Sequence, residues 1–532
     1  MIGLELSPGY TRTALLPPLA GFFVPGEGQR VALADGPADT LSVWTEIGEG
    51  FAAQMRLDAN DPANRYSWRE TLVAALRNVY PIGALTLSSG WSQLQSSGSG
   101  LQASYTGNRA ISTSSGSAEA TVTVDADHSY DLWVYYTGRT NGGYCRVEID
   151  DAQELVNEIA DPAGLGYKAF ATYAANDLTR RQSIKVASGL QGAHVIRLTN
   201  GGVANPGGNA IMIEAVGITG SLADSRILPP AWSASTQYTM GDEVQHGGLF
   251  YTARATGVSG SAGPTHSGGI ASDGALDWRA DNRPTYPNFV AIDYASEREY
   301  AAEFAVAGNT TDLGGQTHGN ESLISRSIQL DGVSWVPGQS LNGLSVGAEI
   351  TMVENTTWQR SEGGDIGECQ LRRVIAPGEV RHDVTLIATA SEVDFAWVYT
   401  GMVPLVHWDG ETKTKVFDTV EPAQNAMLDL DDYDGVNPPN IVYDDVERIG
   451  LSGKIFGNDL SYGHEIGKLA AGDELFGACD AILRPNINAS SASGSTDWMA
   501  KLYASSGPFQ MVAGDTLGFY SRHVMKTSTA AS

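Results

Sequence analysis

Apolar and polar residues alternate over short stretches along most of this chain, which is the pattern of β-strands that bury one face. Residues 118–124 alternate small or apolar side chains with polar ones, and residues 130–136 are aromatic and β-branched. Further strands are expected at 146–149, 182–187, 194–199 and 210–218. Short strands at this spacing, joined by turns, predict a β-sandwich over 88–222.

One segment departs from the strand period. Ser67 and Glu70 have the spacing of a helix capping box, in which each side chain satisfies a backbone amide. Apolar residues then recur at helical spacing, and Pro81 ends the run. These apolar residues are Leu72, Leu76 and Val79. The pattern predicts a helix over 67–80 within a small N-terminal α+β unit, 1–85, that serves either as a docking end or as a plain cap.

Strand-like runs return from 286 to 532, where segments rich in Pro, Gly and Asn separate them. They are expected at 323–330, 349–353, 369–375, 379–389, 395–399 and 413–417. A second, larger β-sandwich is the expected result. No internal repeat at a fixed period is visible, which argues against a β-helix or a propeller. The expected fold class is therefore mainly β, with multi-domain β-sandwich or jelly-roll modules.

The length of the chain indicates that these strands belong to several domains. A chain of 532 residues is too long for one core, so three or four domains are expected. We place them at 1–85, 88–222, 230–282 and 286–532. The 62 glycines suit a chain with many tight turns between strands.

Charge and cysteine content narrow the functional classes. Lys and Arg total 33 against 61 for Asp and Glu, a formal charge of −28 that repels phosphate backbones, so no nucleic-acid partner is expected. Cys145, Cys369 and Cys479 form neither a CxxC pair nor a disulfide framework, which indicates folding in a reducing cytoplasm. No stretch approaches an apolar membrane span, and residues 1–24 lack the features of a signal peptide. We expect synthesis in the cytoplasm without a signal peptide and no membrane insertion.

Four stretches within 88–222 resemble galactose-binding-like jelly-roll modules, which also occur in phage tail and spike proteins. The stretches are 145–150 (CRVEID), 170–173 (FATY), 181–182 (RQ) and 189–198 (GLQGAHVIRL). The resemblance implies a carbohydrate-binding surface, for which the candidates are Trp133, Tyr135, Arg139 and Tyr144. Trp133 and Tyr135 share one face of a strand, and packing against a neighbouring element is the alternative role for that face.

A sharper motif lies in 230–282. It runs W-x5-Y-x2-G-D-x-V from Trp232, continues as G-x-x-Y-x-A through Tyr251, and ends on a late Trp278. This resembles the small carbohydrate-binding modules of the chitinase type. The three aromatic residues are expected to supply most of the core of so small a unit, and they are also its candidates for sugar contact. The aromatic pair that stacks on sugars in chitin binders is replaced by 254–256 (RAT), so a spacer or another glycan specificity is expected.

The last segment holds the best candidates for catalysis. His318 and Glu321 lie close in sequence, in a stretch that resembles C-terminal domains of some phage fibre proteins. His382 and His407 could join them in a polysaccharide lyase, which needs a base and a group that neutralises the sugar carboxylate. Nothing in the spacing selects these residues, and the GxSxG, HExxH and P-loop motifs are absent from the sequence. We therefore assign no catalytic residue.

A dense carboxylate run at 429–435 resembles a calcium loop in composition. Its register fails for an EF-hand, because position one would be Leu430 and position twelve would be Ile441. An acidic, solvent-facing turn is expected there, and no metal ligand is assigned. Calcium in another geometry remains open, and no other cofactor is expected.

These features favour a fibre or a head or tail spike on the surface of a phage or of a phage-like particle of the gene-transfer-agent type. Such an adhesin would bind a bacterial surface polysaccharide, such as a capsule, during host attachment. It would also contact other virion proteins of the capsid, tail or baseplate. Fibres are commonly trimers, so a homo-oligomer is expected although no coiled coil is visible. The alternatives are a virion-associated polysaccharide depolymerase, lyase or hydrolase, with its active site in the C-terminal domain, and a secreted glycan-degrading enzyme.

Overall fold

The structure is a computed structural model of the chain. It describes residues 30–35, 40–58, 65–95, 109–162, 164–175, 179–204, 208–222, 231–238, 242–247, 249–266, 270–281, 289–294, 302–306, 321–337, 344–360, 363–404, 417–422, 428–429, 441–443, 448–455, 458–469, 480–486, 497–505 and 508–528. Every described element is a β-strand except one 3-10 turn, η2 (Ile82–Ala84), which confirms the expected mainly β fold. Within these ranges no helix is long and apolar enough to cross a membrane.

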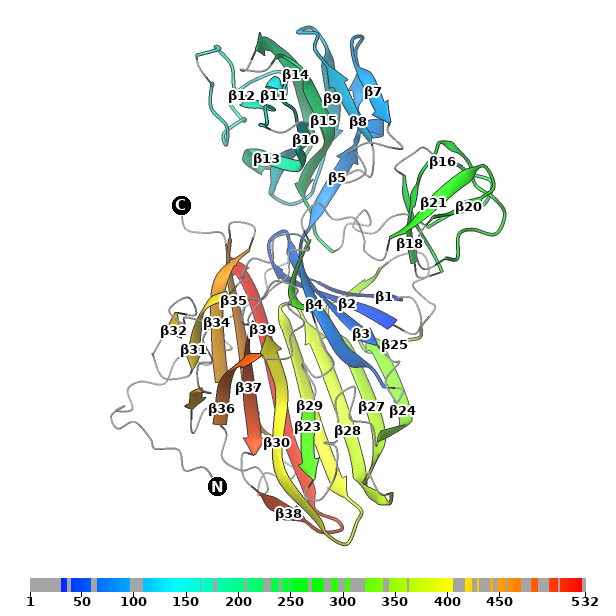
Figure 1. The fold of residues 1–532 in the computed structure, drawn as a ribbon, viewed down its shortest axis with the longest axis vertical. Helices are drawn as coiled ribbons and strands as arrows, with labels where there is room; N and C mark the ends of the chain where they lie inside the picture. Colours follow the sequence, from blue (N-terminus) through cyan, green and yellow to red (C-terminus); the bar gives the residue numbers. More distant parts are fainter. Residues whose placement is uncertain are drawn as a thin grey trace.

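Figure 1 shows three bodies: a large base, a sandwich above it and a small module at one side. One sheet of the base has the order β22-β4-β3-β2-β1-β26. Its strands are β22 (Phe289–Tyr294), β4 (Ser67–Ala75), β3 (Phe51–Asp58), β2 (Thr40–Gly48), β1 (Val31–Asp35) and β26 (Ser345–Gly347). β22 pairs directly with β4, so the sandwich and the small module, which lie between them in the sequence, are both inserted into the base.

A ten-stranded sheet forms the other large layer of the base, in the order β25-β24-β27-β28-β29-β39-β35-β34-β31-β32. Its strands are β25 (Val333–Trp335), β24 (Glu321–Leu330), β27 (Ile350–Gln359), β28 (Asp365–Ala376), β29 (Glu379–Ala388), β39 (Thr516–Ser528), β35 (Asn458–Lys468), β34 (Arg448–Ile455), β31 (Phe417–Pro422) and β32 (Leu428–Asp429). A third sheet joins β23 (Ala302–Val306), β30 (Val393–Pro404), β37 (Asp497–Ser505), β36 (Asp480–Asn486), β33 (Ile441–Tyr443) and β38 (Phe509–Met511).

The three sheets of the base share one hydrophobic core. This core contains Val43 of β2, Leu386 of β29 and Phe395 of β30, all with almost no exposed surface. The sequence-based boundaries treat 1–85 and 286–532 as separate units, whereas here strands from both ranges share one sheet and one core. We therefore describe these two segments together as the base.

The helix expected at 67–80 is a wrong prediction. The segment forms β4 and then β5 (Arg77–Pro81), which leaves the base and pairs with the sandwich. β4 lies between two strands and packs on both faces, with Trp68 in one core cluster and Ala74 in another. The three apolar residues at helical spacing are divided between β4, the residue after it and β5, as Leu72, Leu76 and Val79. Pairing with β3 and β22 outweighed the local capping signal.

The sandwich has the two antiparallel sheets expected of a β-sandwich, and it includes β5 and β6 (Thr86–Leu87), which precede the expected range 88–222. One sheet has the order β13-β10-β15-β8-β7, with β5 also paired to β15, and the other has the order β12-β11-β14-β9-β6. The first sheet contains β13 (Thr179–Leu190), β10 (Tyr130–Gly138), β15 (Ile211–Thr219), β8 (Arg109–Thr113) and β7 (Ser92–Gln95). The second contains β12 (Ala169–Ala171), β11 (Gly143–Ile149), β14 (His194–Ala204), β9 (Glu119–Val124) and β6 (Thr86–Leu87). Apolar side chains from both sheets meet in one core.

Two buried charged residues tie the sandwich to the base. Arg77 lies over the ring of Trp133 at 3.8 Å and over that of Phe51 at 5.7 Å, which joins a sandwich strand to a base strand. Glu46 of the base accepts a hydrogen bond from the backbone of Leu222 at 2.6 Å, where the chain leaves the sandwich. Burial raises the pKa of Glu46, although hydrogen bonds from the backbone oppose that shift. These contacts fix both chain crossings between the two bodies.

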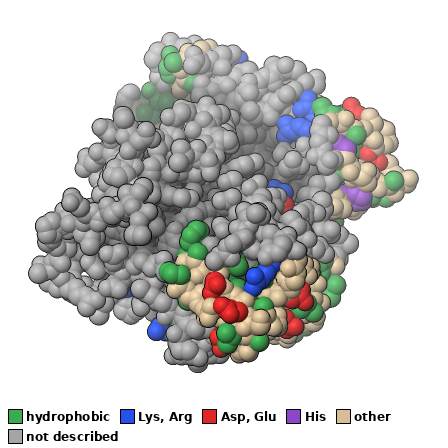
Figure 2. Space-filling model, turned by 60° about the horizontal axis from the view of Figure 1, so that its bottom comes forward, with side chains coloured by type: hydrophobic (Ala, Val, Ile, Leu, Met, Phe, Trp, Pro, Cys, Tyr) green, Lys and Arg blue, Asp and Glu red, His purple; other side chains and the backbone are tan. Residues whose placement is uncertain are grey.

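The small module contains a two-stranded and a four-stranded sheet. They are built from β16 (Gln237–Tyr238) and β19 (Gly257–Val258), and from β17 (Glu243–His246), β18 (Leu249–Ala253), β21 (Leu276–Asp281) and β20 (Ile270–Asp273). The module projects at the right of the molecule in Figures 1 and 2. On the face drawn in Figure 2, the coloured surface mixes charged, polar and hydrophobic side chains and shows no broad hydrophobic patch.

Candidate functional site

The β12-β11-β14-β9-β6 sheet of the sandwich has one face in the core and one toward solvent. Exposed and buried positions alternate along β9, and the same alternation continues on β14, where Ile196 and Leu198 enter the core. The outward side chains on these two strands are Glu119, Thr121, Thr123, Val195, Arg197 and Thr199. Because a strand places successive side chains on opposite faces, the polar positions of the sequence converge on this outer face.

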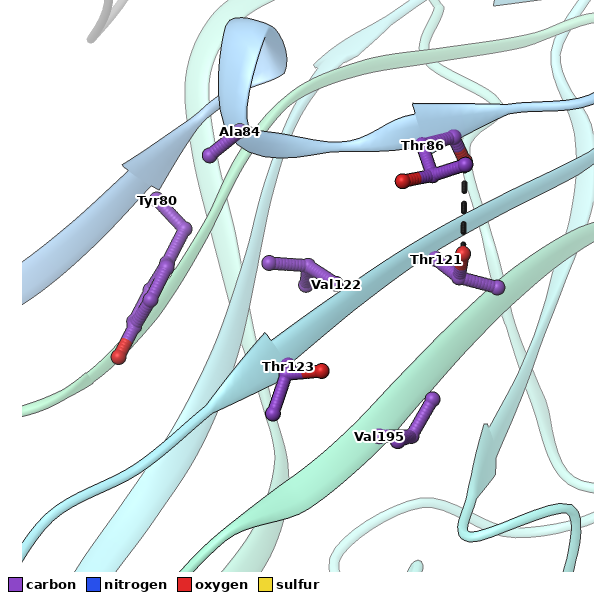
Figure 3. Close-up of a pocket in the computed structure, with 7 residues that line it drawn as sticks. All are labelled: Tyr80, Ala84, Thr86, Thr121, Val122, Thr123 and Val195. Atoms are coloured by element: carbon purple, nitrogen blue, oxygen red, sulfur yellow. Dashed lines mark hydrogen bonds between the residues drawn. The ribbon is translucent and has the colours of Figure 1, made fainter.

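A pocket of about 420 Å³ opens at one edge of this face, where β5 and η2 run past β6 and β9. It is lined by Tyr80, Ala84, Thr86, Thr121, Val122, Thr123 and Val195 (Figure 3). These residues come from five different elements, and β5 connects the sandwich to the base. The pocket therefore forms only when the two sheets of the sandwich are assembled.

The pocket combines an aromatic ring, hydroxyl groups and an aliphatic side chain. The hydroxyl of Tyr80 accepts a hydrogen bond from the backbone N–H of Asp125 at 3.2 Å, which holds the ring at the rim. Thr121 donates its hydroxyl to the carbonyl oxygen of Thr86 at 3.5 Å, the dashed line in Figure 3. Val195 exposes 40% of its surface. Such a lining suits a ligand that has both an apolar face and polar edges.

Beside the pocket, Arg197 is surrounded by carboxylates. It lies directly opposite Thr121 on β9 and opposite Glu148 on β11. Its Nη2 lies 2.6 Å from Asp151 Oδ1, while Nε lies 3.7 Å from Glu119 Oε2 and Nη1 lies 3.8 Å from Glu148 Oε2. One guanidinium group thus compensates three carboxylates at this point of the face.

A tight turn positions the acidic residues. Asp150 and Asp151 have φ values of 54° and 60°, in the left-handed region that aspartate tolerates better than most residues. Asp150 Oδ1 accepts the backbone N–H of Val195 at 2.9 Å, and Oδ2 lies 2.7 Å from His194 Nδ1. The backbone hydrogen bond and then the histidine lower the pKa of Asp150, so this carboxylate is ionised at neutral pH. The turn is therefore fastened to the strand that borders the pocket.

Further along the same face, β11 adds Arg146 and Tyr144, and the segment before β12 adds Tyr167. Arg146 forms an ion pair with Glu148, and its guanidinium lies 5.3 Å from the ring centroid of Tyr167. Tyr167 donates its hydroxyl to the carbonyl oxygen of Gly201 at 2.9 Å. Tyr144, a residue expected from the sequence to contact sugar, is half-buried and alternates with the core residue Cys145 on β11. Of the predicted aromatic residues, it is the one that lies on this sheet.

The other predicted residues of the sandwich lie elsewhere. Tyr135 on β10 has no exposed surface, so its ring has no face to offer an external sugar. Trp133, on the same side of β10, is half-buried and packed against Arg77 at the junction with the base. Arg139 follows β10 and donates its backbone N–H to the carbonyl oxygen of Thr172 at 3.0 Å. The aromatic face of β10 thus serves packing, which was the alternative role for that face.

The aromatic residues of the small module form its core. Tyr251 is 1% exposed and Trp278 is fully buried, and Trp232 packs against them. The indole N–H groups of both tryptophans donate to Asp273 Oδ2, at 3.1 Å and 3.2 Å. The core role that the sequence analysis expected is therefore observed. The buried rings of Tyr251 and Trp278 leave no face for sugar stacking, and Trp232 is partly buried.

Of the predicted C-terminal residues, Glu321 and His382 lie in the described part of the chain, and each is bonded to a buried arginine. Glu321 is buried and paired with Arg65 at 2.6 Å. His382 is buried as well, and its Nε2 accepts a hydrogen bond from Arg373 Nε at 3.2 Å. His318 and His407 lie outside the described residues.

Two histidines that sequence reasoning missed lie beside His382. The ring of His523 lies 5.5 Å from that of His382 and stacks on that of His464 at 4.2 Å. Ser521 Oγ lies 3.0 Å from Nε2 of both His464 and His523. Burial lowers the pKa of His464 to about 3 and holds the pKa of the other two well below the usual value. No local motif could have found this cluster, because its members meet only through strand pairing.

Metal binding has no support from side-chain geometry in the part of the chain that the structure describes. There, no group of three or more His, Cys, Asp and Glu residues is arranged to hold a metal ion. The acidic run at 429–435 is described only at Asp429, the last residue of β32. A calcium site in that run stays a prediction.

No family model and no curated protein matches the chain. Among solved structures, it is similar to a family 35 carbohydrate binding module from Clostridium thermocellum, with 17% identity over 28% of this chain and 100% of that one, at a TM-score of 0.21. It is similar to the CBM36-1 domain of a multidomain xylanase from the hindgut metagenome of Trinervitermes trinervoides, with 12% identity over 27% and 98% of the two chains and a TM-score of 0.19. A third similar structure is the Podospora anserina GH26-CBM35 β-(1,4)-mannanase, with 17% identity and a TM-score of 0.20. The match covers 30% of this chain and 30% of the mannanase. These values are too low to assign a family or a function.

Proposed function

We propose that the chain is a carbohydrate-binding protein and that the outer face of the β12-β11-β14-β9-β6 sheet binds a bacterial surface polysaccharide. The pocket at the edge of this face is the observation that carries the proposal. Sugars have an apolar ring face and hydroxyl edges, which match the ring of Tyr80 and the hydroxyls of Thr121 and Thr123. The resemblance of 145–150 and 189–198 to galactose-binding-like modules agrees with this assignment.

We further propose that the protein acts as an adhesin. A virion fibre or spike would present several copies of the face, and linked sites raise avidity without new contacts. This arrangement suits a shallow site on a module that projects from a larger base (Figure 1). The virion partners and the oligomeric state rest on the sequence resemblance to phage fibre and spike proteins.

A depolymerase remains the alternative function, without an observation that favours it. Glu321 and His382, the described candidates for catalysis, are buried and bonded to Arg65 and Arg373. A general acid or base must reach the substrate bond, and neither side chain has a surface to do so.

The proposal is tested by retention of the full-length protein on immobilised polysaccharides from candidate hosts, with sugar chain length read in the same samples. Val195→Lys adds bulk and charge beside the pocket, and we expect it to weaken binding about tenfold or more. Val258→Lys is the matched control, because Val258 lies on the small module and is 44% exposed against 40% for Val195. Equal binding by both variants would refute the site, and shortening of the sugar chain would establish the depolymerase instead.

A further inference from the structure

Beside the pocket, carboxylates outnumber guanidinium groups. The side chain of Arg197 is 27% exposed, and those of Asp151 and Glu119, which it contacts, are 68% and 48% exposed. The third contact, Glu148, is 11% exposed and is shared with Arg146. Two guanidinium groups therefore face three carboxylates. The ionised Asp150 stands at the end of the same row, paired only with a histidine.

Geometry holds these carboxylates in place. Asp150 and Asp151 occupy consecutive left-handed positions, a conformation that costs backbone energy and persists only where surrounding contacts enforce it. The backbone N–H of Asp150 donates to the carbonyl oxygen of Val195 at 2.9 Å. The backbone N–H of Val195 donates to Asp150 Oδ1, also at 2.9 Å. The turn thus fixes the backbone that carries Asp150 and Asp151, and it holds the Asp150 carboxylate beside Val195 at the pocket.

This arrangement decides which sugars can dock. An arginine that is to receive a sugar carboxylate must offer its planar pair of N–H groups to it. The guanidinium of Arg197 has Asp151 Oδ1 at 2.6 Å and carboxylate oxygens of Glu119 and Glu148 at 3.7 Å and 3.8 Å, so each of its nitrogens already faces a carboxylate of the protein. An incoming anion would meet excess negative charge, whereas a neutral hydroxyl can donate to a carboxylate and accept from an arginine.

We propose that this face selects neutral glycan chains and excludes chains that carry carboxylate, sulfate or phosphate groups. Glu119, Glu148 and Asp151 are the specificity-determining residues, and they act by occupying Arg197. This inference rests on the proposed function, since it names the substrate class of the same site. If the proposal is correct, substituting the carboxylates beside Arg197 with amides should allow the face to bind acidic chains.

The test uses the full chain and measures dissociation constants for four soluble polymers. Dextran and galactomannan are the neutral probes, and polygalacturonate and alginate are the acidic ones. At low ionic strength we expect the neutral polymers to bind about tenfold or more tightly than the acidic ones. Added salt should narrow that gap, because it screens the repulsion.

The decisive variant is Glu119→Gln/Asp151→Asn, which frees two sides of Arg197. We expect the ratio of its affinity for polygalacturonate to its affinity for the bound neutral polymer to rise about tenfold. Glu349→Gln/Asp365→Asn is the matched control, because it removes the same charge from exposed positions on the base. Asp151→Asn alone provides a milder change if the double variant melts at a lower temperature.

The outcomes separate the two proposals. Equal binding of neutral and acidic polymers by the unmodified protein, or no gain on polygalacturonate in the double variant, overturns the selectivity while leaving the carbohydrate-binding function in place. An equal gain in the control variant also overturns it, because overall charge would then explain the effect. Failure of the unmodified protein to bind any of the four polymers overturns the selectivity for neutral chains, and absence of retention on the host polysaccharides as well overturns the carbohydrate-binding function.

Discussion

The sandwich and the base are both made of β-sheets, yet they are assembled in different ways. The sandwich takes its strands from one continuous segment, from β5 at Arg77–Pro81 to β15 at Ile211–Thr219. The base pairs strands from far apart in the sequence, such as β4 with β22 and β1 with β26. Local patterning was therefore sufficient to predict the sandwich. In the base it was not, because the partners that decide a strand lie in distant segments.

The two bodies also differ in what they bury. Beside its apolar core, the sandwich buries the carboxylate of Glu214, which accepts a hydrogen bond from the hydroxyl of Thr137, but none of its described histidines is buried. The base buries a polar track between its layers, including Arg65 with Glu321, Arg373 with His382, and His523. The stability of a region that buries charges and neutral histidines depends on pH and on intact partners, whereas the stability of an apolar core does not. We therefore expect the base to be more sensitive than the sandwich to acid and to the loss of a buried partner.

Acid should unfold the base before the sandwich, and this is the largest effect expected. His464 has its ordinary pKa near 6.5 in the unfolded chain and a pKa of about 3 in the folded one. Between these values the unfolded state binds more protons, so stability is full above pH 6.5 and falls as the pH drops toward 3. That shift corresponds to roughly 4–5 kcal/mol at the acidic end, and His382 and His523 shift in the same direction.

Hydrogen exchange followed by mass spectrometry at pH 7, 6, 5 and 4, with rates corrected for intrinsic exchange, measures this effect. We expect protection in β29 and β39 to be lost at a higher pH than protection in β11 and β14. His464→Gln should remove part of the pH dependence of the base. Parallel loss of protection in both bodies would contradict the proposed role of the histidine cluster.

Removing one partner of a buried ion pair should come next in size. Glu321→Gln removes the carboxylate that pairs with the buried Arg65, a change that typically costs about 3–5 kcal/mol. Glu119→Gln in the sandwich removes a half-exposed partner of Arg197 and should cost less than about 1 kcal/mol. Urea unfolding midpoints of the two variants give the comparison. Similar midpoints would show that the pair in the base contributes no more than the surface pair.

The smallest effect should come from overpacking at the outer side of the first sandwich sheet. A Cβ atom at Gly217 would lie 2.6 Å from the ring of the buried Tyr135, so Gly217→Ala forces the ring or the strand to shift. Overpacking of this kind costs about 1–3 kcal/mol. Gly189→Ala is a poor control, because Gly189 has a φ of 70°. Ser183→Ala, at an exposed position of β13, is a better one, and thermal melting should separate it from Gly217→Ala.

Several parts of the candidate site could be predicted from the sequence. The alternation over 118–124 identifies Thr121 and Thr123 as outward residues of a strand, and the structure confirms it. The pocket itself could not be predicted, because Tyr80 was assigned to the end of a helix. Tyr135 was a reasonable candidate for sugar contact by residue type, yet a surface position cannot be read from a strand whose second face is also covered.

Local alternation and aromatic content settled the β class, most strands of the sandwich and the aromatic core of the small module, because neighbouring residues determine which side of a strand is apolar. The tertiary structure decided that β4 is a strand and that two modules are inserted between it and β22. It also decided that Arg197 is occupied by three carboxylates and that three histidines meet in the base. Each of these depends on contacts between residues far apart in the chain, and no local pattern carries the free energy of such contacts.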